Sequence, residues 1–153
     1  LPLKTGIGLL GEEKWDTTRK RDTMQAEELV ISFFERVYNQ KDFAYVFEIY
    51  ADNYYEHTEK GARCNQDCYN IITGVHSIFP DLHVTMNEIL SRDDIVAVRL
   101  TVTATHQGEF FGIPATAKAI TFEAMEFFKI ANGKITESWG SWPIYDILEM
   151  LKQ

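Results

Sequence analysis

Apolar and polar side chains alternate along residues 95–107, and this alternation organises the rest of the chain. One face of the pattern is purely aliphatic, with Val96, Val98, Leu100, Val102 and Ala104. A period of two predicts a β-strand. At a rise of about 3.3 Å per residue this strand would span roughly 40 Å, a length at which strands usually bend around a core. His106 follows on the apolar face, so its imidazole is the first candidate for chemistry.

Apolar positions before residue 80 have helical spacing. A helix is predicted over residues 22–39, and Asp42 can cap a second, shorter one. Residues 53–58 are expected to be extended. A third helix is predicted over residues 65–79, where Pro80 helps to stop it. The apolar face of the first helix consists of Leu29, Ile31, Phe33, Phe34, Val37 and Tyr38.

From residue 82 onward the spacing changes from helical to alternating. Strands are predicted over residues 82–87, 95–107, 116–130 and 134–142. Asn132-Gly133 is a strong hairpin signal, and a short helix is expected over residues 144–151. Helices followed by a mainly antiparallel sheet indicate an α+β fold. If the helices cross the concave side of a curved sheet, a pocket is left between the two layers.

The chain of 153 residues has the length of one domain. We expect an N-terminal arm over residues 1–21 and a single domain over residues 22–153. Glycines at positions 6, 8 and 11 argue against regular structure in the arm. Its Leu9, Leu10 and Trp15 are candidates to pack on the body or on a second subunit.

The net charge is −8 and the chain has no basic cluster, which disfavours nucleic acid and anionic membranes as partners. No apolar stretch is long enough for a transmembrane helix. Residues 1–10 lack the charged region and cleavage site of a signal peptide. Cys64 and Cys68 are the only cysteines, and their spacing suits neither a disulfide nor a metal site well. Two free thiols agree with a reducing compartment, so we expect a cytoplasmic protein.

Several short motifs follow one another in a fixed order. Phe79-Pro80-Asp81 comes after the third helix, residues 105–114 read T-H-Q-G-E-F-F-G-I-P, and residues 133–139 read G-K-I-T-E-S-W. A Tyr-x-His, formed by Tyr55 and His57, follows the second helix. Over about residues 23–153 the chain resembles the SnoaL-like polyketide cyclases of the nuclear-transport-factor-2-like superfamily.

The resemblance implies a cone-shaped α+β barrel, with three N-terminal helices over the concave face of a curved sheet and a short C-terminal helix. It also implies a deep pocket and a homodimer formed through the outer sheet face. The expected partner is a hydrophobic, carbonyl-rich small molecule, and neither a metal nor a cofactor is expected.

In these cyclases an Asp four residues after the tryptophan of the last strand is the acid/base of an aldol ring closure. Pro143 occupies that position here. Counting instead from Trp142 gives Asp146, which we predict as the acid/base, with His106 as hydrogen-bond donor or relay. A carboxylate in an apolar pocket has a raised pKa and is a better base near neutral pH.

The remaining candidates are predicted to bind the substrate. They are His57, Tyr55, Trp139, Phe110, Phe122 and Trp142. Trp139 and Trp142 have opposite parity, so at most one of them faces the pocket directly. Phe110 and Phe111 lie in a loop that can cover a cavity. Glu126 shares the parity of Ile120 and Phe122, and is either a pocket carboxylate or an interface residue.

The favoured function is that of a cofactor-independent cyclase or isomerase. A non-catalytic module that binds a hydrophobic ligand is the first alternative, and Pro143 at the expected acid/base position favours it. A dehydratase or hydrolase on the same fold is the second, and would need Glu126 or Glu137 to point inward. A single fold hosts many functions, so the site has to decide between them.

Overall fold

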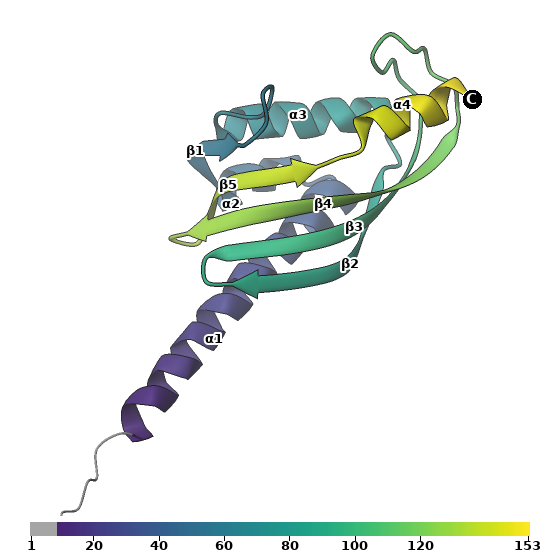
Figure 1. Cartoon of the computed structure of the whole chain (residues 1–153). Coiled ribbons are helices and arrows are strands. Elements are labelled where there is room, and N and C mark those ends of the chain that lie inside the picture. The colour runs from purple at the N-terminus through teal and green to yellow at the C-terminus, as the bar shows by residue number, and fades with distance from the viewer. Residues whose placement is uncertain (1–8) are drawn as a thin grey trace, which may run out of the picture.

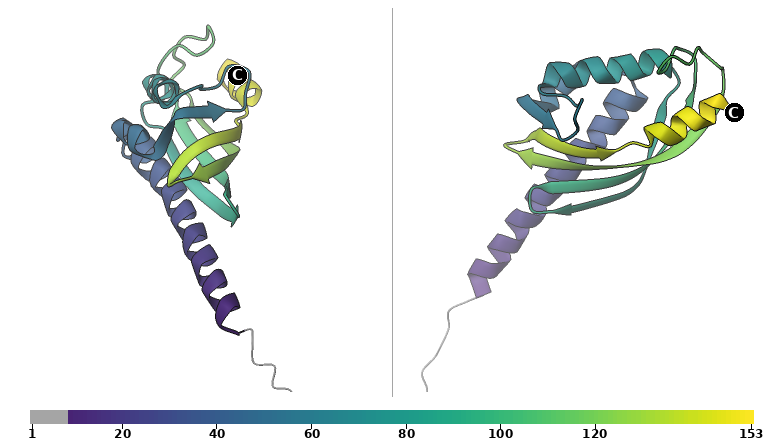
Figure 2. Two further views of the ribbon diagram at one scale, coloured as in Figure 1. Left: turned by 90° about the vertical axis from the view of Figure 1, so that its left-hand side faces the viewer. Right: turned by 45° about the horizontal axis from the view of Figure 1, so that its top comes forward.

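The computed structural model describes the backbone of residues 9–153 and the side chains from residue 17 onward. Helices lie on one side of a curved five-stranded sheet, as the two views in Figure 2 show. None of the helices described is long and apolar enough to cross a membrane. The order of helices and strands confirms the α+β architecture that the alternation and the helical spacing predicted.

The first helix, α1, runs from Leu9 to Ser32 and extends away from the sheet (Figure 1). The predicted start at residue 22 is wrong, because the sequence from residue 12 to residue 31 contains no Gly or Pro to interrupt a helix. The side chains of Leu9, Leu10 and Trp15 lie outside the described part of the chain, so their packing stays a prediction. The division between arm and domain also stays a prediction.

A π-helix, η1 (Phe33–Asn39), continues α1 without a break. It buries Phe33, Phe34 and Val37 together. Short π-helical segments occur often at functional sites. The wider turn brings the two adjacent phenylalanines onto the sheet, where both rings contact Phe128.

Two short helices and an edge strand follow, η2 (Phe43–Tyr45), α2 (Val46–Ile49) and β1 (Tyr50–Glu56). The strand begins three residues before its predicted start at residue 53. It pairs in parallel with β5 (Lys134–Ser141), a contact between distant segments that a local pattern does not show. The third predicted helix is confirmed as α3 (Asn65–Ile78).

The sheet has the order β1-β5-β4-β3-β2. Its other strands are β2 (His83–Arg92), β3 (Ile95–Thr105) and β4 (Ala119–Ala131), which pair antiparallel with their neighbours. Asn132 and Gly133 both have positive φ (52° and 71°), as their predicted hairpin turn requires. The aliphatic face of β3 is buried against the helices, as the alternation predicted.

The Phe-Pro-Asp motif fastens the end of α3 to the long strand β3. Phe79 is buried, and the Asp81 carboxylate accepts hydrogen bonds from the Thr105 backbone N–H (2.7 Å) and hydroxyl (2.6 Å). These bonds lower the pKa of Asp81. The last helix, α4 (Ile144–Lys152), follows β5 at the end of the sheet where β4 begins, and it buries Ile147 and Leu151 (Figure 1).

Candidate functional site

A carboxylate lies buried on the inner face of the sheet, the face turned toward the helices. Glu126 is in the middle of β4, opposite Val98 on β3 and Gly140 on β5. Among the described residues, Glu126 is one of the buried polar or charged side chains, together with His76, His106 and Ser138. The alternation of β4 places Glu126 here because Ala124 and Phe128, two residues away on either side, also face inward.

Residues of β5 and the segment after it surround the Glu126 carboxyl group. The Trp142 indole N–H donates to its Oε2 at 3.4 Å, and the fully buried Ser138 of β5 lies on the same inner face. Gly140 leaves the room for this arrangement. A Cβ at Gly140 would lie 3.3 Å from the Trp142 ring and 3.5 Å from the carboxyl carbon of Glu126.

The acidity of Glu126 is shifted toward neutral pH. Burial raises the pKa of Glu126 to about 7, and the charge of Glu56 acts in the same direction. The hydrogen bonds from Ser138 and Trp142 oppose that rise. Near neutral pH the group is therefore present both as base and as acid, which is the property of an acid/base catalyst.

Phenols from two other elements share this interior. The pKa values of Tyr38, Tyr50 and Tyr54 are all raised by burial and by the Glu126 charge, so these hydroxyls stay protonated. The Tyr38 ring is nearly parallel to the Trp142 ring, with centroids 6.1 Å apart and an interplanar angle of 15°. The Phe122 ring meets Trp142 edge-on at 6.0 Å. The tryptophan that donates to Glu126 is thus itself flanked by the aromatic rings of Tyr38 and Phe122.

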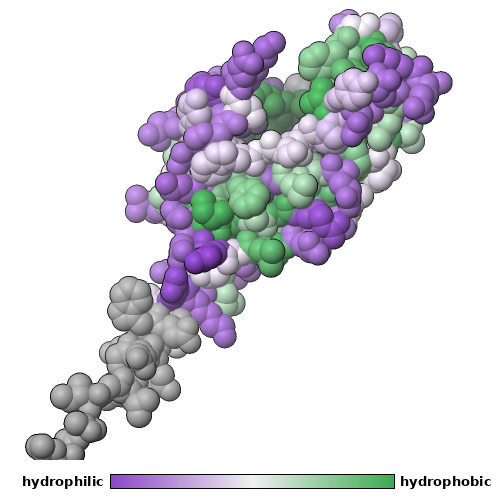
Figure 3. Space-filling view, in the orientation of Figure 1, coloured by the Kyte–Doolittle hydropathy of each residue, from purple (hydrophilic) through white to green (hydrophobic). Residues whose placement is uncertain are grey.

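The surface opens near the end of β5, the strand that Trp142 follows. Figure 3 shows a depression above β5, between the β1–α3 connection and α4, with hydrophobic atoms at its bottom.

Asp146 is not part of this interior. It is exposed in the first turn of α4, where the inward positions are Ile147 and Leu151. The expectation that Asp146 shares a pocket with His106 is therefore corrected. Its position is that of an acidic side chain at a helix N-terminus, where the helix dipole favours it.

His106 is fully buried, but far from Glu126. It lies eight residues beyond Val98, the partner of Glu126, which is about 26 Å along the strand direction. The Thr116 backbone N–H donates to its Nδ1 at 3.2 Å, so the ring proton of the neutral form is on Nε2. Nε2 has no partner among the described residues. His106 and Glu126 cannot act on the same small group.

Tyr55, His57 and Trp139 lie on the outer face of the sheet, the face turned away from the helices. The His57 ring stacks on Trp139 with centroids 4.3 Å apart and meets Tyr55 at 4.8 Å. His57 Nε2 lies 2.9 Å from Glu137 Oε1. These three residues are not brought to Glu126, because their neighbours Tyr54 and Ser138 take the inward positions.

The parity argument for the two tryptophans is confirmed, since only Trp142 contacts the inner residues. Phe122 lies beside it. Phe110 instead packs on Phe79 at 5.5 Å, near His106, and Phe111 is 72% exposed. The sequence could have identified Glu126 from its parity, but β4 also has Met125 and Phe127 on the opposite face, so the pattern of this strand did not show which face is covered.

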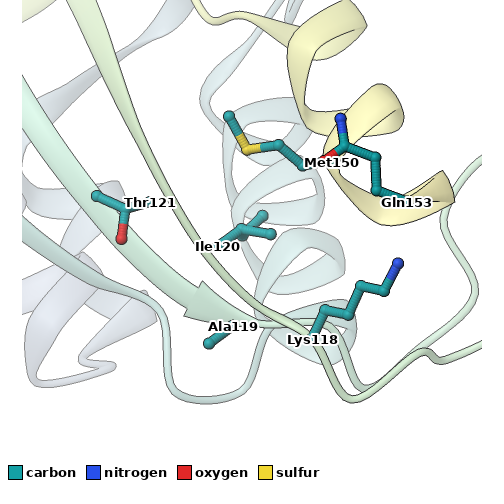
Figure 4. Close-up of a pocket in the computed structure, with 6 residues that line it drawn as sticks. All are labelled: Lys118, Ala119, Ile120, Thr121, Met150 and Gln153. Carbon is teal, nitrogen blue, oxygen red and sulfur yellow. The ribbon is translucent and has the colours of Figure 1, made fainter.

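A separate groove of about 380 Å³ lies between the start of β4 and the end of α4 (Figure 4). Lys118 borders it, and its ammonium group donates to the Leu151 carbonyl at 3.0 Å, so its charge stabilises the end of α4. Glu126 is not among the lining residues, which are Lys118, Ala119, Ile120, Thr121, Met150 and Gln153. Within the described residues no cluster of His, Cys, Asp or Glu could hold a metal ion.

Comparison with known proteins gives a family and a set of similar folds. A family model described as SnoaL-like polyketide cyclase matches residues 28–153. Among curated proteins, none matches the chain.

Several solved structures are similar over most of their length. AclR from Streptomyces galilaeus, described as "a putative hydroxylase", is 26% identical with a TM-score of 0.76, over 85% of this chain and 97% of that one. A "putative SnoaL-like polyketide cyclase" from Jannaschia sp. CCS1 is 17% identical with a TM-score of 0.78, over 84% and 92%. IdmH from Streptomyces antibioticus, "a putative polyketide cyclase", is 22% identical with a TM-score of 0.73, over 84% and 99%. These likenesses confirm the fold.

Proposed function

Because the chain belongs to the SnoaL-like polyketide cyclase family, we propose that it is a cofactor-independent cyclase or isomerase whose acid/base is Glu126. The proposed substrate is a hydrophobic, carbonyl-rich small molecule of the polyketide kind. The observation that carries the proposal is the burial of the Glu126 carboxyl group among aromatic side chains, which raises its pKa to about 7.

The proposed reaction begins with removal of a proton from a carbon next to a carbonyl. Ionised Glu126 takes this proton, and the electrons of the C–H bond move into an enolate. The neutral acid then returns the proton, either at another carbon or at the alkoxide formed when the enolate closes a ring. A base with a pKa near the working pH can do both steps efficiently.

The negative charge of the enolate needs a donor that stays protonated. The phenol of Tyr38 fits this role, because burial and the Glu126 charge hold its pKa well above the ordinary range. The Trp142 indole N–H is a second donor beside the same carboxyl group. The stacked Tyr38 and Trp142 rings supply a flat apolar wall that orients a planar substrate.

His106 keeps a separate proposed role as a ligand contact at the other end of the inner face. Its buried Nε2–H has no partner among the side chains of residues 17–153, which supports this role because an unsatisfied buried donor costs about 1–3 kcal/mol. A long, multi-ring substrate could accept a hydrogen bond there while its reacting carbon lies at Glu126.

The test of the binding site uses 2-tetralone, a flat apolar ketone. Trp142→Phe is expected to weaken its binding about tenfold, because the ligand loses part of an aromatic wall and a hydrogen-bond donor. Isothermal titration calorimetry measures the affinity. Trp139→Phe on the outer face is the matched control and is expected to bind like the wild type. The opposite ranking of the two variants would place the ligand on the outer face.

Two alternatives remain on the same fold. A non-catalytic binding module is supported by Pro143 and by the exposed position of Asp146. This alternative predicts that the protein binds the ligand tightly but does not catalyse exchange of the ligand's protons with the solvent. A dehydratase or hydrolase is supported by the inward position of Glu126, whereas Glu137 points outward and is bound by His57 and Lys129.

We also propose that the protein forms a homodimer through the outer sheet face. Four cross-strand neighbours form an apolar row on this face, Leu90, Ala97, Phe127 and Trp139. Figure 3 shows hydrophobic side chains gathered over these strands. Leu90 is 70% exposed and Phe127 is 50% exposed, and exposed apolar side chains that adjoin one another mark a candidate interaction surface. A twofold axis would place this row against the same row of a second copy of the chain.

Phe127→Glu is expected to weaken self-association at least about tenfold, because it places a charge at the centre of the apolar row. Sedimentation velocity over a range of concentrations measures the effect. Phe111→Glu, which changes an exposed phenylalanine in the loop after β3, is the control and should leave association unchanged. A wild-type protein that stays monomeric at the highest concentration refutes the proposal.

We further propose a cytoplasmic location. Cys64 and Cys68 are both free in the structure, which agrees with a reducing compartment. Fractionation of the producing cells tests this directly.

A further inference from the structure

His76 is a buried side chain to which the proposed reaction gives no role. It lies in the last turn of α3 and is only 6% exposed. Its Nδ1 is 2.9 Å from the carbonyl oxygen of Ile72, one turn earlier in the same helix, and its Nε2 is 3.0 Å from the carbonyl oxygen of Tyr38 in η1. Each ring nitrogen therefore faces a main-chain oxygen, and the second contact joins two different helices.

The two contacts together require two protons on the ring. A carbonyl oxygen can only accept a hydrogen bond, and a neutral imidazole has a single N–H. Both bonds therefore form at once only when His76 is an imidazolium. The last turn of a helix is a favourable place for this cation, because the negative end of the helix dipole lies there.

A ring with one proton keeps one of these bonds, and the geometry indicates which one. Nδ1 and the Ile72 carbonyl belong to the same helix, so they could separate only by a change of the His76 rotamer. The rings of Tyr38 and Phe43 oppose that change, since their centroids lie 5.4 Å and 5.0 Å from the imidazole. The Tyr38 carbonyl belongs to η1, which can move relative to α3. The remaining proton therefore stays on Nδ1, and loss of the other proton releases the Tyr38 carbonyl.

The bond from His76 holds the end of η1 at a point where the helix itself supplies no donor. Tyr38 is the last residue but one of η1, and the last carbonyls of a helix have no intrahelical partner. The next residue, Asn39, binds both backbone groups of Val84 on β2, at 2.8 Å to the N–H and 3.0 Å to the carbonyl. The end of η1 is thus attached to α3 by His76 and to the sheet by Asn39, and it carries the Tyr38 ring that lies against Trp142.

We propose that His76 is a positioning residue: with two protons it fastens η1 to α3 and fixes Tyr38 against Trp142, and with one proton it releases the Tyr38 carbonyl. This proposal rests on the proposed function, in which the Tyr38 phenol is the donor to the enolate and the Tyr38 ring is part of the apolar wall. His76 acts through Tyr38 and does not touch the substrate.

The other titratable and charged groups near His76 do not form this attachment in its place. Among the described residues, Tyr38 is the titratable group in ring contact with His76, and burial and the Glu126 charge hold the pKa of Tyr38 well above its ordinary range, so its phenol stays neutral. Arg36 and Asp42 pair with each other at 2.5 Å. Within the described part of the chain, no other such group of α3, η1, η2 or the turn between η1 and η2 is hydrogen-bonded to His76; these groups are Glu35, Lys41, Tyr45, Asp67, Cys68 and Tyr69.

The test follows His76 and Tyr38 together by NMR over a pH series in the substrate-free protein. Histidine carries ¹⁵N in the ring and tyrosine carries ¹³C at the carbonyl and ring carbons, and the two sets of signals are assigned by their loss in His76→Gln and Tyr38→Phe. All samples contain Glu126→Gln, so that the carboxyl group beside Trp142 does not titrate. We expect Nδ1 to keep its proton throughout, and the Tyr38 signals to shift with the same midpoint as the loss of the Nε2 proton.

Three further substitutions separate positioning from a general structural role. His76→Gln should keep the attachment but lose its pH dependence, because the amide keeps an N–H donor near the position of Nε2 and does not titrate. His76→Phe keeps a ring but no donor, so its Tyr38 signals should resemble those of the alkaline parent at every pH. His83→Gln changes an exposed histidine of β2 and, as the matched control, should leave the Tyr38 shift unchanged.

The proposal is overturned if the Tyr38 signals do not follow the titration of His76, or if the neutral ring keeps its proton on Nε2. The comparison with His76→Gln decides the question even if His76→Phe does not fold. Because no substrate is present, the result is separate from the proposed function. Coupled signals together with normal 2-tetralone exchange in Glu126→Gln would retain the role of His76 and reject the acid/base role of Glu126. Uncoupled signals together with lost exchange would do the reverse.

Discussion

Glu126→Gln is expected to lower the protein-catalysed exchange of deuterium into 2-tetralone about 100- to 10,000-fold, because removal of a general base typically has this effect. The amide keeps the size of the side chain and an oxygen that can accept from the Trp142 indole, but it does not take up the substrate proton. Proton NMR in deuterated buffer measures the rate. Glu126→Asp keeps the carboxylate but withdraws it from the aromatic wall, and should retain part of the activity.

Two other substitutions make the result specific. Glu123→Gln changes an exposed carboxylate on the outer face of the same strand and should leave the exchange rate unchanged. Asp146→Asn separates the two candidate acid/base residues. If Asp146→Asn abolishes exchange and Glu126→Gln does not, the reaction takes place near α4 and the role given to Glu126 is wrong.

Glu126→Gln is also expected to change how stability depends on pH. Between acid and alkaline pH, the free energy of unfolding of the variant should rise by about 3 kcal/mol relative to that of the wild type. The pKa of Glu126 is raised from 4.5 to about 7 by folding, so the folded state binds the proton more tightly than the unfolded state. The stability that this proton contributes is complete below the unfolded value of 4.5 and is lost as the pH rises through about 7. The size follows from about 1.4 kcal/mol for each pKa unit.

Urea unfolding of the wild type and the variant at about pH 4 and about pH 8 measures this difference. Asp81 and Glu137 have lowered pKa values and destabilise both proteins alike at acid pH, so they cancel in the comparison. Glu123→Gln again serves as the control. Parallel stability curves for wild type and Glu126→Gln would mean that the carboxyl group is ionised without penalty in the folded state.

These two expectations describe one compromise. An ionised carboxylate in an apolar interior lowers stability, and the same burial brings its pKa to the range that the proposed acid/base chemistry needs. The Ser138 and Trp142 hydrogen bonds limit the loss without removing it.

Much of the fold was predictable because its signals are local. The alternation in β3 gave the correct buried face, and Asn132-Gly133 gave the correct hairpin. The start of β1 was missed because its pairing with β5 joins segments far apart in the chain. The π-helical turn at Phe33–Asn39 was missed because apolar residues at helical spacing do not distinguish a π-helix from an α-helix.

The site was harder to predict for a geometric reason. Parity correctly separated Trp139 from Trp142 and grouped Glu126 with Phe122. Unlike β3, however, β4 has large apolar side chains on both faces, with Met125 and Phe127 on the outer one, so its pattern did not show which face the helices cover. Asp146 was chosen by counting from a tryptophan, and counting cannot give the rotation of α4 about its axis. That rotation turns Ile147 and Leu151 inward and leaves Asp146 exposed.

The pH dependence of deuterium exchange into 2-tetralone, measured at low probe concentration, tests the central role of Glu126 most directly. Under these conditions the profile reports groups of the free protein. The rate is predicted to rise with pH through a midpoint at about 7, the pKa of Glu126, and the rise should be absent in Glu126→Gln. A midpoint near 4.5, the ordinary value for a glutamate, or the same profile in Glu126→Gln, would contradict the account.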